Sequence, residues 1–287
     1  MKKKQTFAKT DYSQNMLPQN RKQIFRDVMH LHWQKLLLLG MILLIFYIPI
    51  LLTTIAYDIY TAGIYHAMPS MTPETQENAV IFVMQLDLIR SIIVIPLLAL
   101  LSVALSGILR TIRQYAWEEN VHIPSDFAKG IRDNFRQTAA LSMLAGLVFT
   151  LCLSVFYSAD AYNSYMVSIL SLLPVAISFL LIFPIFLTAL IMIPVYSNRL
   201  GATLKNAFFV YTRSLLRSLG FLLLCQIIWI PALVPNLQFH IFGSIFAVLL
   251  TPIALLGWTV FCYNNFDKHL NPLVCPELIG KGTFHTK

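Results

Sequence analysis

The run LLLLGMILLIFYIPILLTTIAY, Leu36–Tyr57, contains 22 residues and no charged side chain. About 20 residues suffice for a helix to cross the roughly 30 Å hydrocarbon layer of a bilayer, because each residue adds about 1.5 Å. Five more apolar runs can cover the same layer: Ser91–Leu109, Thr138–Tyr157, Met166–Tyr196, Leu219–Val234 and Ile241–Tyr263. The sequence therefore predicts an all-α, polytopic membrane bundle of six transmembrane helices.

Lysine and arginine are distributed unevenly around these runs. In the seven segments that flank and separate the runs, their numbers are 8, 1, 5, 0, 4, 0 and 3 along the chain, so that 20 of 21 lie in alternate segments. The positive-inside rule places such segments in the cytoplasm. We therefore expect a multi-pass protein of the cell membrane whose two termini and two long basic loops are cytoplasmic.

The overall composition supports a membrane protein. Hydrophobic residues make up 57% of the chain and the mean hydropathy is +0.68, which is more apolar surface than a water-soluble domain can bury. The net charge of +8 does not indicate nucleic acid, because the basic residues stand beside the spans, where anionic headgroups attract them. Membrane lipid is the expected partner, and nucleic acid is not.

The predicted organisation has three parts. Residues 1–35 form a cytoplasmic basic leader with an amphipathic helix, residues 36–265 the six-span domain, and residues 266–287 a cytoplasmic tail. Apolar residues at helical spacing also precede the third and fifth runs. The three stripes are Phe25, Val28, His32 and Leu36; Phe127, Ile131 and Phe135; and Leu204, Phe208, Tyr211 and Leu215. Basic residues surround each stripe, so we expect three amphipathic helices on the cytoplasmic face.

Each amphipathic segment leads into a pair of spans. The chain can therefore be read as three copies of one unit, made of a surface helix, a span, an outer turn and a second span. The motif Phe25-Arg26-Asp27 aligns with Ile131-Arg132-Asp133, although shared identities are few. Equally, any membrane protein with inside-facing loops tends to have interfacial amphipathic segments. Superposition of the three hairpins would distinguish these readings.

Two helix starts and one ion pair can be predicted. Thr72 can cap a helix that has Pro73 at its first position. We expect this helix to project beyond the bilayer surface and to continue into the second span. Pro124 and Ser125 supply the start of the helix before the third span. Asp87 and Arg90 are three residues apart on one helix face and can pair at the headgroup level. A structural pair is the expected role, with a ligand site as the alternative.

The middles of the spans are uncharged. None holds Asp, Glu, Lys, Arg or His, which argues against a proton relay or an intramembrane acid–base enzyme. Gln226 is the one bulky amide and is our intramembrane polar candidate, with interhelical hydrogen bonding as the alternative role. Pro174, Pro184 and Pro194, ten residues apart, predict a bent and tilted fourth span.

Catalytic and cofactor motifs are missing from the sequence. It contains no glycine-rich phosphate loop, no zinc-binding histidine pair with a glutamate and no nucleophile elbow. The four cysteines, Cys152, Cys225, Cys262 and Cys275, have neither metal-site nor redox spacing. We therefore predict a protein that is not an enzyme and that has no cofactor, metal or disulfide.

A resemblance adds a functional expectation. The segments Leu101–Gly107, Arg110–Arg113, Pro124–Phe127 and Gly130–Gln137 resemble the YesL-like family of bacterial integral membrane proteins, and Leu204–Phe208 is similar to a later element of it. The likeness covers roughly residues 31 to 265. Members of that family have no known biochemical function and tend to accompany carbohydrate-uptake systems of Gram-positive bacteria. The resemblance thus implies an accessory of a sugar permease.

Two functions remain open from the sequence. In the first, the protein is a non-enzymatic accessory that docks a transporter through a cytoplasmic surface. The docking candidates are Phe127, Ile131, Arg132, Phe135 and Arg136. In the second, it is a permease subunit that presents the loop between the second and third spans to a separate ATPase subunit. We rank the second lower, because the Glu-Ala-Ala and Gly pattern of importer subunits is absent from that loop.

Overall fold

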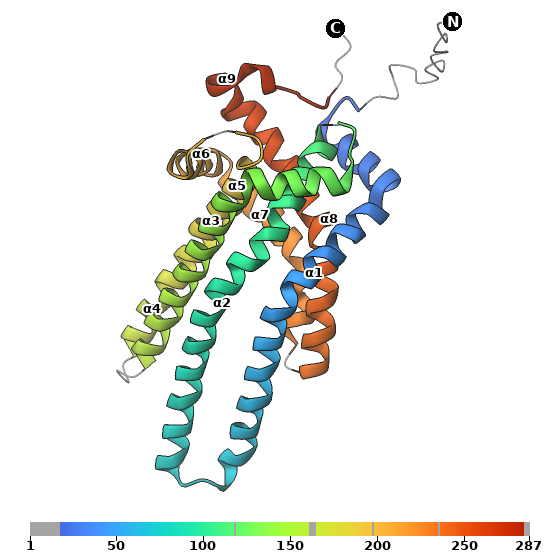
Figure 1. Ribbon diagram of the computed structural model, residues 1–287. Coiled ribbons are helices and arrows are strands. Elements are labelled where there is room, and N and C mark those ends of the chain that lie inside the picture. Colours follow the sequence, from blue (N-terminus) through green and yellow to red (C-terminus); the bar gives the residue numbers. More distant parts are fainter. Residues whose placement is uncertain (1–17, 118, 161–164, 197, 235, 284–287) are drawn as a thin grey trace, which may run out of the picture.

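The computed structural model of the protein describes residues 18–117, 119–160, 165–196, 198–234 and 236–283. In these ranges the chain is helical and has no strand (Figure 1), which confirms the predicted all-α class. The α-helices are α1 (Arg21–Ala67), α2 (Pro73–Ala116), α3 (Ile123–Asp160), α4 (Tyr165–Ile177), α5 (Phe183–Met192), α6 (Leu200–Arg213), α7 (Leu215–Gln226), α8 (Leu237–His269) and α9 (Asn271–Val274). A π-helical turn, Ser178–Ile182, joins α4 to α5, and 3-10 turns occupy Met68–Ser70, Ile227–Leu233 and Pro276–Leu278.

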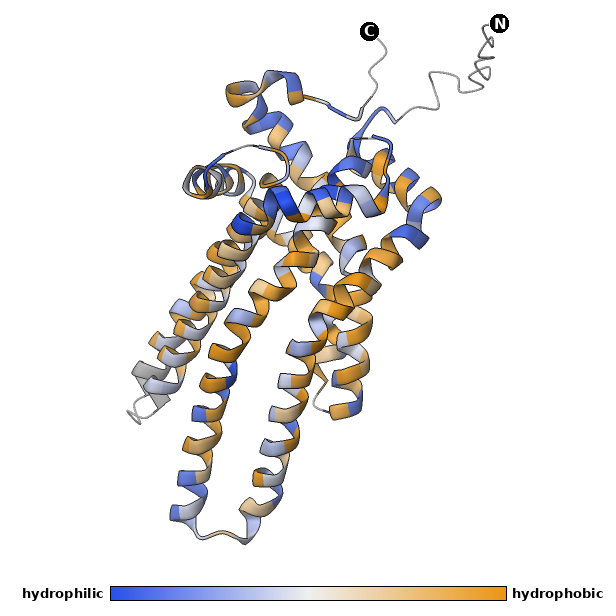
Figure 2. Cartoon of the chain, viewed as in Figure 1, coloured by the Kyte–Doolittle hydropathy of each residue, from blue (hydrophilic) through white to orange (hydrophobic). Residues whose placement is uncertain are grey.

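Within the described residues, six helices are long and apolar enough to cross a membrane, as predicted. They cover Arg21–Ser70, Pro73–Ala116, Ile123–Ser158, Ile169–Met192, Leu215–Leu233 and Leu237–His269. Many large apolar side chains on them are exposed, for example Leu170 at 64% and Phe242 at 71%. Figure 2 shows hydrophobic residues along much of the helix shafts, and hydrophilic residues at the end where the described chain starts and stops. Such a surface is suited to lipid.

The helices α1 and α2 form a hairpin that extends beyond the other helices (Figure 1). They contain 47 and 44 residues, or about 70 Å and about 66 Å at the α-helical rise. The predicted start of α2 is confirmed, because Pro73 opens it and the Thr72 hydroxyl accepts a hydrogen bond from the Thr75 amide at 3.4 Å. We call the tip of this hairpin the hairpin end, and the opposite end the basic end.

Helix boundaries do not follow the predicted domain limits. Helix α1 passes residue 35 without a break, and α8 continues past residue 265 to His269. Helix α3 begins at Ile123, before Pro124 and Ser125, and the Asp126 carboxylate accepts from the His122 amide at 2.7 Å. The predicted leader and tail therefore differ from the six-span domain in composition, and neither limit coincides with the end of a helix. Residues 1–17 and 284–287, with Lys2, Lys3, Lys4, Lys9 and Lys287, lie outside the described residues.

The three predicted repeat units differ in their connections. The amphipathic segments before the first and third spans continue directly into α1 and α3, whereas α6 ends at Arg213 and α7 begins at Leu215. The Ser214 hydroxyl at this junction donates to the Val210 carbonyl at 3.0 Å. Neither the repeat nor three surface helices of one kind is confirmed, and the repeat stays a prediction.

A π-helical turn interrupts the α-helix of the fourth span just before Pro184, while the predicted bend and tilt of this span stay predictions. Pro184 has no amide hydrogen, so the carbonyl of Leu180 four residues earlier loses its helical partner. The backbone there forms the π-helical turn Ser178–Ile182, and the Tyr211 hydroxyl of α6 donates to the Leu180 carbonyl. Burial raises the pKa of Tyr211, which keeps its hydroxyl protonated as a donor at neutral pH. This bond ties α6 to the π-helical turn.

Glycines allow two close helix crossings. A Cβ at Gly40 of α1 would overlap the Leu249 carbonyl of α8, and one at Gly107 of α2 would stand 2.4 Å from the Phe127 ring of α3. Gly130 of α3 faces the Ser106 carbonyl in the same way. In lipid, helices are not driven together by the hydrophobic effect and associate mainly through close packing. Small residues allow this, because they let two backbones approach closely. The α1–α8 and α2–α3 pairs therefore cross at close range.

Candidate functional site

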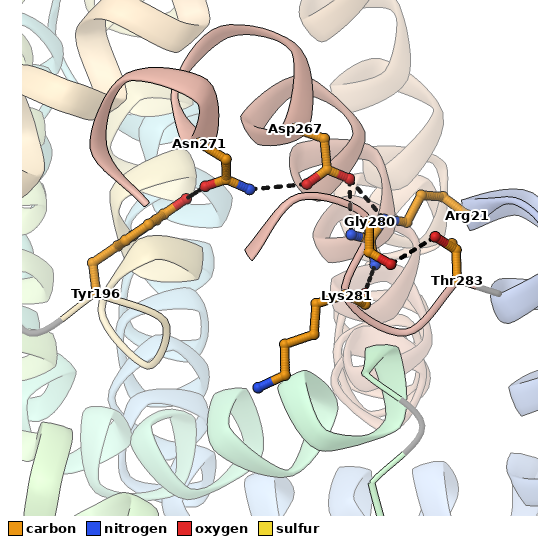
Figure 3. Close-up of polar contacts among 7 residues, drawn as sticks. All are labelled: Arg21, Tyr196, Asp267, Asn271, Gly280, Lys281 and Thr283. Atoms are coloured by element: carbon orange, nitrogen blue, oxygen red, sulfur yellow. Dashed lines mark hydrogen bonds and ion pairs between the residues drawn. The ribbon is translucent and has the colours of Figure 1, made fainter. Parts of the chain in front are cut away.

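The basic end is held together by a polar network around Arg21, at the start of α1 (Figure 3). The Arg21 guanidinium donates to the Asp267 carboxylate from Nη2 at 2.8 Å and from Nε at 3.3 Å, and to the Lys281 carbonyl at 2.5 Å. Asn271 Nδ2 donates to Asp267 at 2.9 Å, and the Tyr196 hydroxyl donates to Asn271 at 2.5 Å. The network joins α1, α8, α9, the tail and the segment after α5.

A second network attaches the tail to the α2–α3 connection. Lys281 Nζ lies 3.4 Å from the Glu119 carboxylate and 3.7 Å from the centre of the Trp117 ring. Arg113 of α2 donates to the Pro194 carbonyl at 2.7 Å and is 3.8 Å from Glu119. Segments that are far apart in the sequence thus meet at this end. The connecting segments at the basic end are thus held to one another by hydrogen bonds and ion pairs.

The predicted docking residues on α3 divide into two groups. Arg132 and Arg136 are exposed, and Arg132 lies 3.4 Å from the neighbouring Asp133 carboxylate. Phe127, Ile131 and Phe135 are partly buried. The Phe127 ring fills the space over Gly107 of α2 and packs against the α1–α2–α8 core. The arginines therefore form the accessible part of this surface, while Phe127 joins helices.

The buried face of α3 runs beside the predicted stripe. Its most buried positions at the basic end are Gly130, Asn134 and Thr138, which are small or polar. Asp133 on the same helix pairs with Arg110 of α2 at 3.1 Å. A polar strip therefore fixes α3 to α2.

The buried face of α6, like that of α3, includes small and polar residues. Its buried residues are Thr203, Ala207, Val210 and Tyr211, whereas Phe208 of the predicted stripe is 54% exposed. Lys205 and Arg213 are exposed as well. The exposed surface of α6 thus combines an aromatic ring with two cations. Helix α6 lies at the same end of the molecule as the start of α3 (Figure 1).

Gln226 lies where the helix of the fifth span changes type. Helix α7 ends at Gln226, and the 3-10 turn that follows contains Pro231. Gln226 lines a mainly apolar cavity of about 510 Å³, together with Cys152 of α3 and Ser178 of the π-helical turn. The Cys152 thiol and the Ser178 hydroxyl are 2.9 Å apart. Sequence reasoning singled out Gln226 but not these two neighbours, because they come from other spans.

A second cavity, of about 520 Å³, is lined by residues from all six spans. Its polar lining includes Tyr47, Thr54, Arg90, His240 and Ser244. The rest of its wall is largely apolar. A volume of this size is typical of a small-molecule site. One of its hydroxyls, that of Thr54, already donates within its own helix, to the Ile50 carbonyl at 3.0 Å.

The predicted pair of Asp87 and Arg90 is confirmed, and its arginine lines this cavity. The Tyr157 hydroxyl of α3 donates to the other oxygen of the Asp87 carboxylate at 2.5 Å. The Arg90 guanidinium lies over the Tyr57 ring of α1, 4.2 Å from its centre. The pair joins α1, α2 and α3, as expected of a structural ion pair.

Neither a metal site nor a known relative identifies the chemistry of the protein. Within the described ranges, no three His, Cys, Asp or Glu residues lie close enough together to hold a metal ion. Comparisons of the chain with family models, with curated proteins and with solved structures found no match.

Proposed function

We propose that this multi-pass membrane protein is a non-enzymatic accessory of a carbohydrate-uptake system, and that its basic end, facing the cytoplasm, docks the transporter. The six apolar helices make the chain suited to a bilayer. The distribution of lysine and arginine supports the cytoplasmic placement of that end. The carbohydrate system is inferred from the resemblance to the YesL-like family.

The docking proposal rests on exposed cations of α3, a helix that is packed closely against α2. Arg132 and Arg136 project from α3, which Asp133 and Gly130 hold against α2. Exposed cations attract a complementary acidic surface. The helix that carries them is already ordered, so its backbone loses little entropy on binding. The partner that fits is thus a protein with an acidic cytoplasmic face close to the membrane.

The cavity lined by all six spans supports the alternative, a permease subunit driven by a separate ATPase. Its size suits a small molecule. The two proposals can be separated by what accompanies the protein. A permease subunit should hold its ATPase in stoichiometric amount, whereas an accessory should recover a complete transporter that contains its own spans.

Co-purification of the full chain from its native membrane, followed by mass spectrometry, makes this distinction. We expect a complete carbohydrate transporter. Stoichiometric recovery of an ATPase without other membrane-spanning subunits would favour the permease alternative. If neither is recovered after crosslinking in the membrane, both proposals fail.

Charge reversal at Arg132→Glu and Arg136→Glu is expected to lower recovery of the partner by about tenfold or more, because like charges then face the acidic surface. Both side chains are exposed, so the amount of folded protein should stay unchanged. The matched control reverses Lys22 and Arg26, which are exposed at the same end on α1. The docking site is placed elsewhere if the two double variants recover equal amounts of partner.

A further inference from the structure

A polar pocket lies between the first turns of α1 and the α2–α3 connection at the basic end. It measures about 340 Å³. Its lining residues are Asp27, Val28, Leu31, His32, Lys35, Tyr115, Glu119, Asn120 and Val121. Lys35 directly precedes the apolar run that begins at Leu36. The pocket therefore lies at the depth where the headgroups of one leaflet meet the bundle.

The charged side chains of this pocket differ in whether they form ion pairs. The Glu119 carboxylate is already paired, with Lys281 at 3.4 Å and with Arg113 at 3.8 Å. The Asp27 carboxylate lies 4.0 Å from the Arg26 guanidinium. Lys35 has no carboxylate within 4.0 Å among the described residues. Among the described residues, the Lys35 ammonium is therefore a charged group of the pocket wall that forms no ion pair.

Tyr115 gives a second, independent observation. Its side chain lines the pocket and is 3% exposed, and its ring lies 5.1 Å from the His32 ring. The Tyr115 hydroxyl is buried and has no hydrogen-bond partner among the described residues. A buried polar group without a partner is unfavourable, and most such groups in folded proteins are satisfied by protein, water or ligand. The hydroxyl marks a place where a ligand oxygen would be stabilised.

We propose that this pocket binds a phosphate group, with the Lys35 ammonium and the Tyr115 hydroxyl as its principal donors. A phosphate offers several acceptor oxygens and a negative charge, which an ammonium and a hydroxyl at headgroup depth complement. The side chains of His32 and Asn120 add polar groups to the same wall. The source that fits the depth of the pocket is the headgroup of an anionic lipid. This site does not depend on the docking proposal.

The experiment uses the full-length protein, purified in detergent, and measures bound lipid by native mass spectrometry. The probes are dioctanoyl phosphatidylglycerol, a neutral dioctanoylglycerol of the same chain length, and inorganic phosphate as a competitor. We compare Lys35→Gln and Tyr115→Phe with Lys22→Gln, an exposed lysine on the same helix that does not line the pocket. Thermal unfolding of each variant without lipid shows whether it is folded.

Each pocket variant is expected to weaken binding of phosphatidylglycerol about tenfold, since each removes one charge-assisted bond. Lys22→Gln should change it by less than about twofold, and the neutral lipid should bind too weakly to saturate. Tyr115→Phe should unfold at the temperature of the wild type or above, because its hydroxyl bonds nothing in the free protein. Saturable binding of inorganic phosphate alone, lost in both pocket variants, would support the phosphate site but overturn the lipid as its source. Equal lipid binding by Lys35→Gln, Tyr115→Phe and Lys22→Gln overturns the site.

Discussion

Replacement of Gly40 with leucine is expected to lower the free energy of unfolding by about 3 kcal/mol, the upper end of the usual cost of overpacking. A Cβ at this position would overlap the carbonyl oxygen of Leu249 and stand 2.9 Å from its carbonyl carbon. The obstacle is backbone, so no rotamer change can relieve it. Helices in lipid associate mainly through close packing, and α1 and α8 would have to separate along their crossing.

The matched control is Gly220→Leu. Gly220 also lies in a span, on α7, but a Cβ there meets nothing within 4 Å. We expect this variant to unfold within about 0.5 kcal/mol of the wild type, as do most substitutions at open positions. Denaturant unfolding in detergent micelles, followed by circular dichroism, measures both. Equal stability of the two variants would contradict the close crossing of α1 and α8.

Replacement of Asp267 with asparagine is expected to cost about 2 to 3 kcal/mol of unfolding free energy. The Arg21 side chain is 9% exposed and would keep its charge without its partner. The expected loss is below the roughly 3–5 kcal/mol of a fully buried pair, because the Asp267 side chain is 18% exposed and asparagine can still accept one bond. The tail, which Arg21 holds through the Lys281 carbonyl, should become more accessible to protease.

Asp27→Asn provides the comparison for this effect. The Asp27 side chain is 37% exposed and its Arg26 partner is 76% exposed, at 4.0 Å. Exposed pairs contribute about 0–1 kcal/mol, so this variant should unfold almost as the wild type does. The same unfolding experiment and limited trypsin digestion measure both variants. Asp267→Asn with wild-type stability and an equally protected tail would contradict the role assigned to the Arg21 network.

Hydropathy and turn chemistry made much of the fold predictable. Runs of apolar residues gave the six spans, and Thr72 with Pro73 gave the start of α2, because both are local properties. The Asp87–Arg90 pair was predictable for the same reason, since its members are three residues apart on one helix. The Arg21–Asp267 pair was not, because its members are 246 residues apart in the sequence.

The orientation of the amphipathic segments was harder to predict. In water an apolar stripe marks the packed face of a helix, whereas in or beside lipid an apolar side chain can face outward and small or polar residues can pack. The buried Thr203 and Ala207 of α6, beside its exposed Phe208, illustrate this difference. The bond from Tyr211 to the Leu180 carbonyl had a partial signal, because Pro184 shows that this carbonyl needs a donor but not which one.

The orientation of the bundle in the membrane is the claim on which the proposed function depends most. It can be tested by labelling single cysteines in intact cells with a membrane-impermeant maleimide, after Cys152, Cys225, Cys262 and Cys275 are replaced. The two sites are Glu77→Cys near the hairpin end and Lys129→Cys at the basic end, both exposed. We predict labelling of E77C in intact cells and of K129C only after the membrane is permeabilised. Labelling of K129C in intact cells, with E77C protected, would contradict the account.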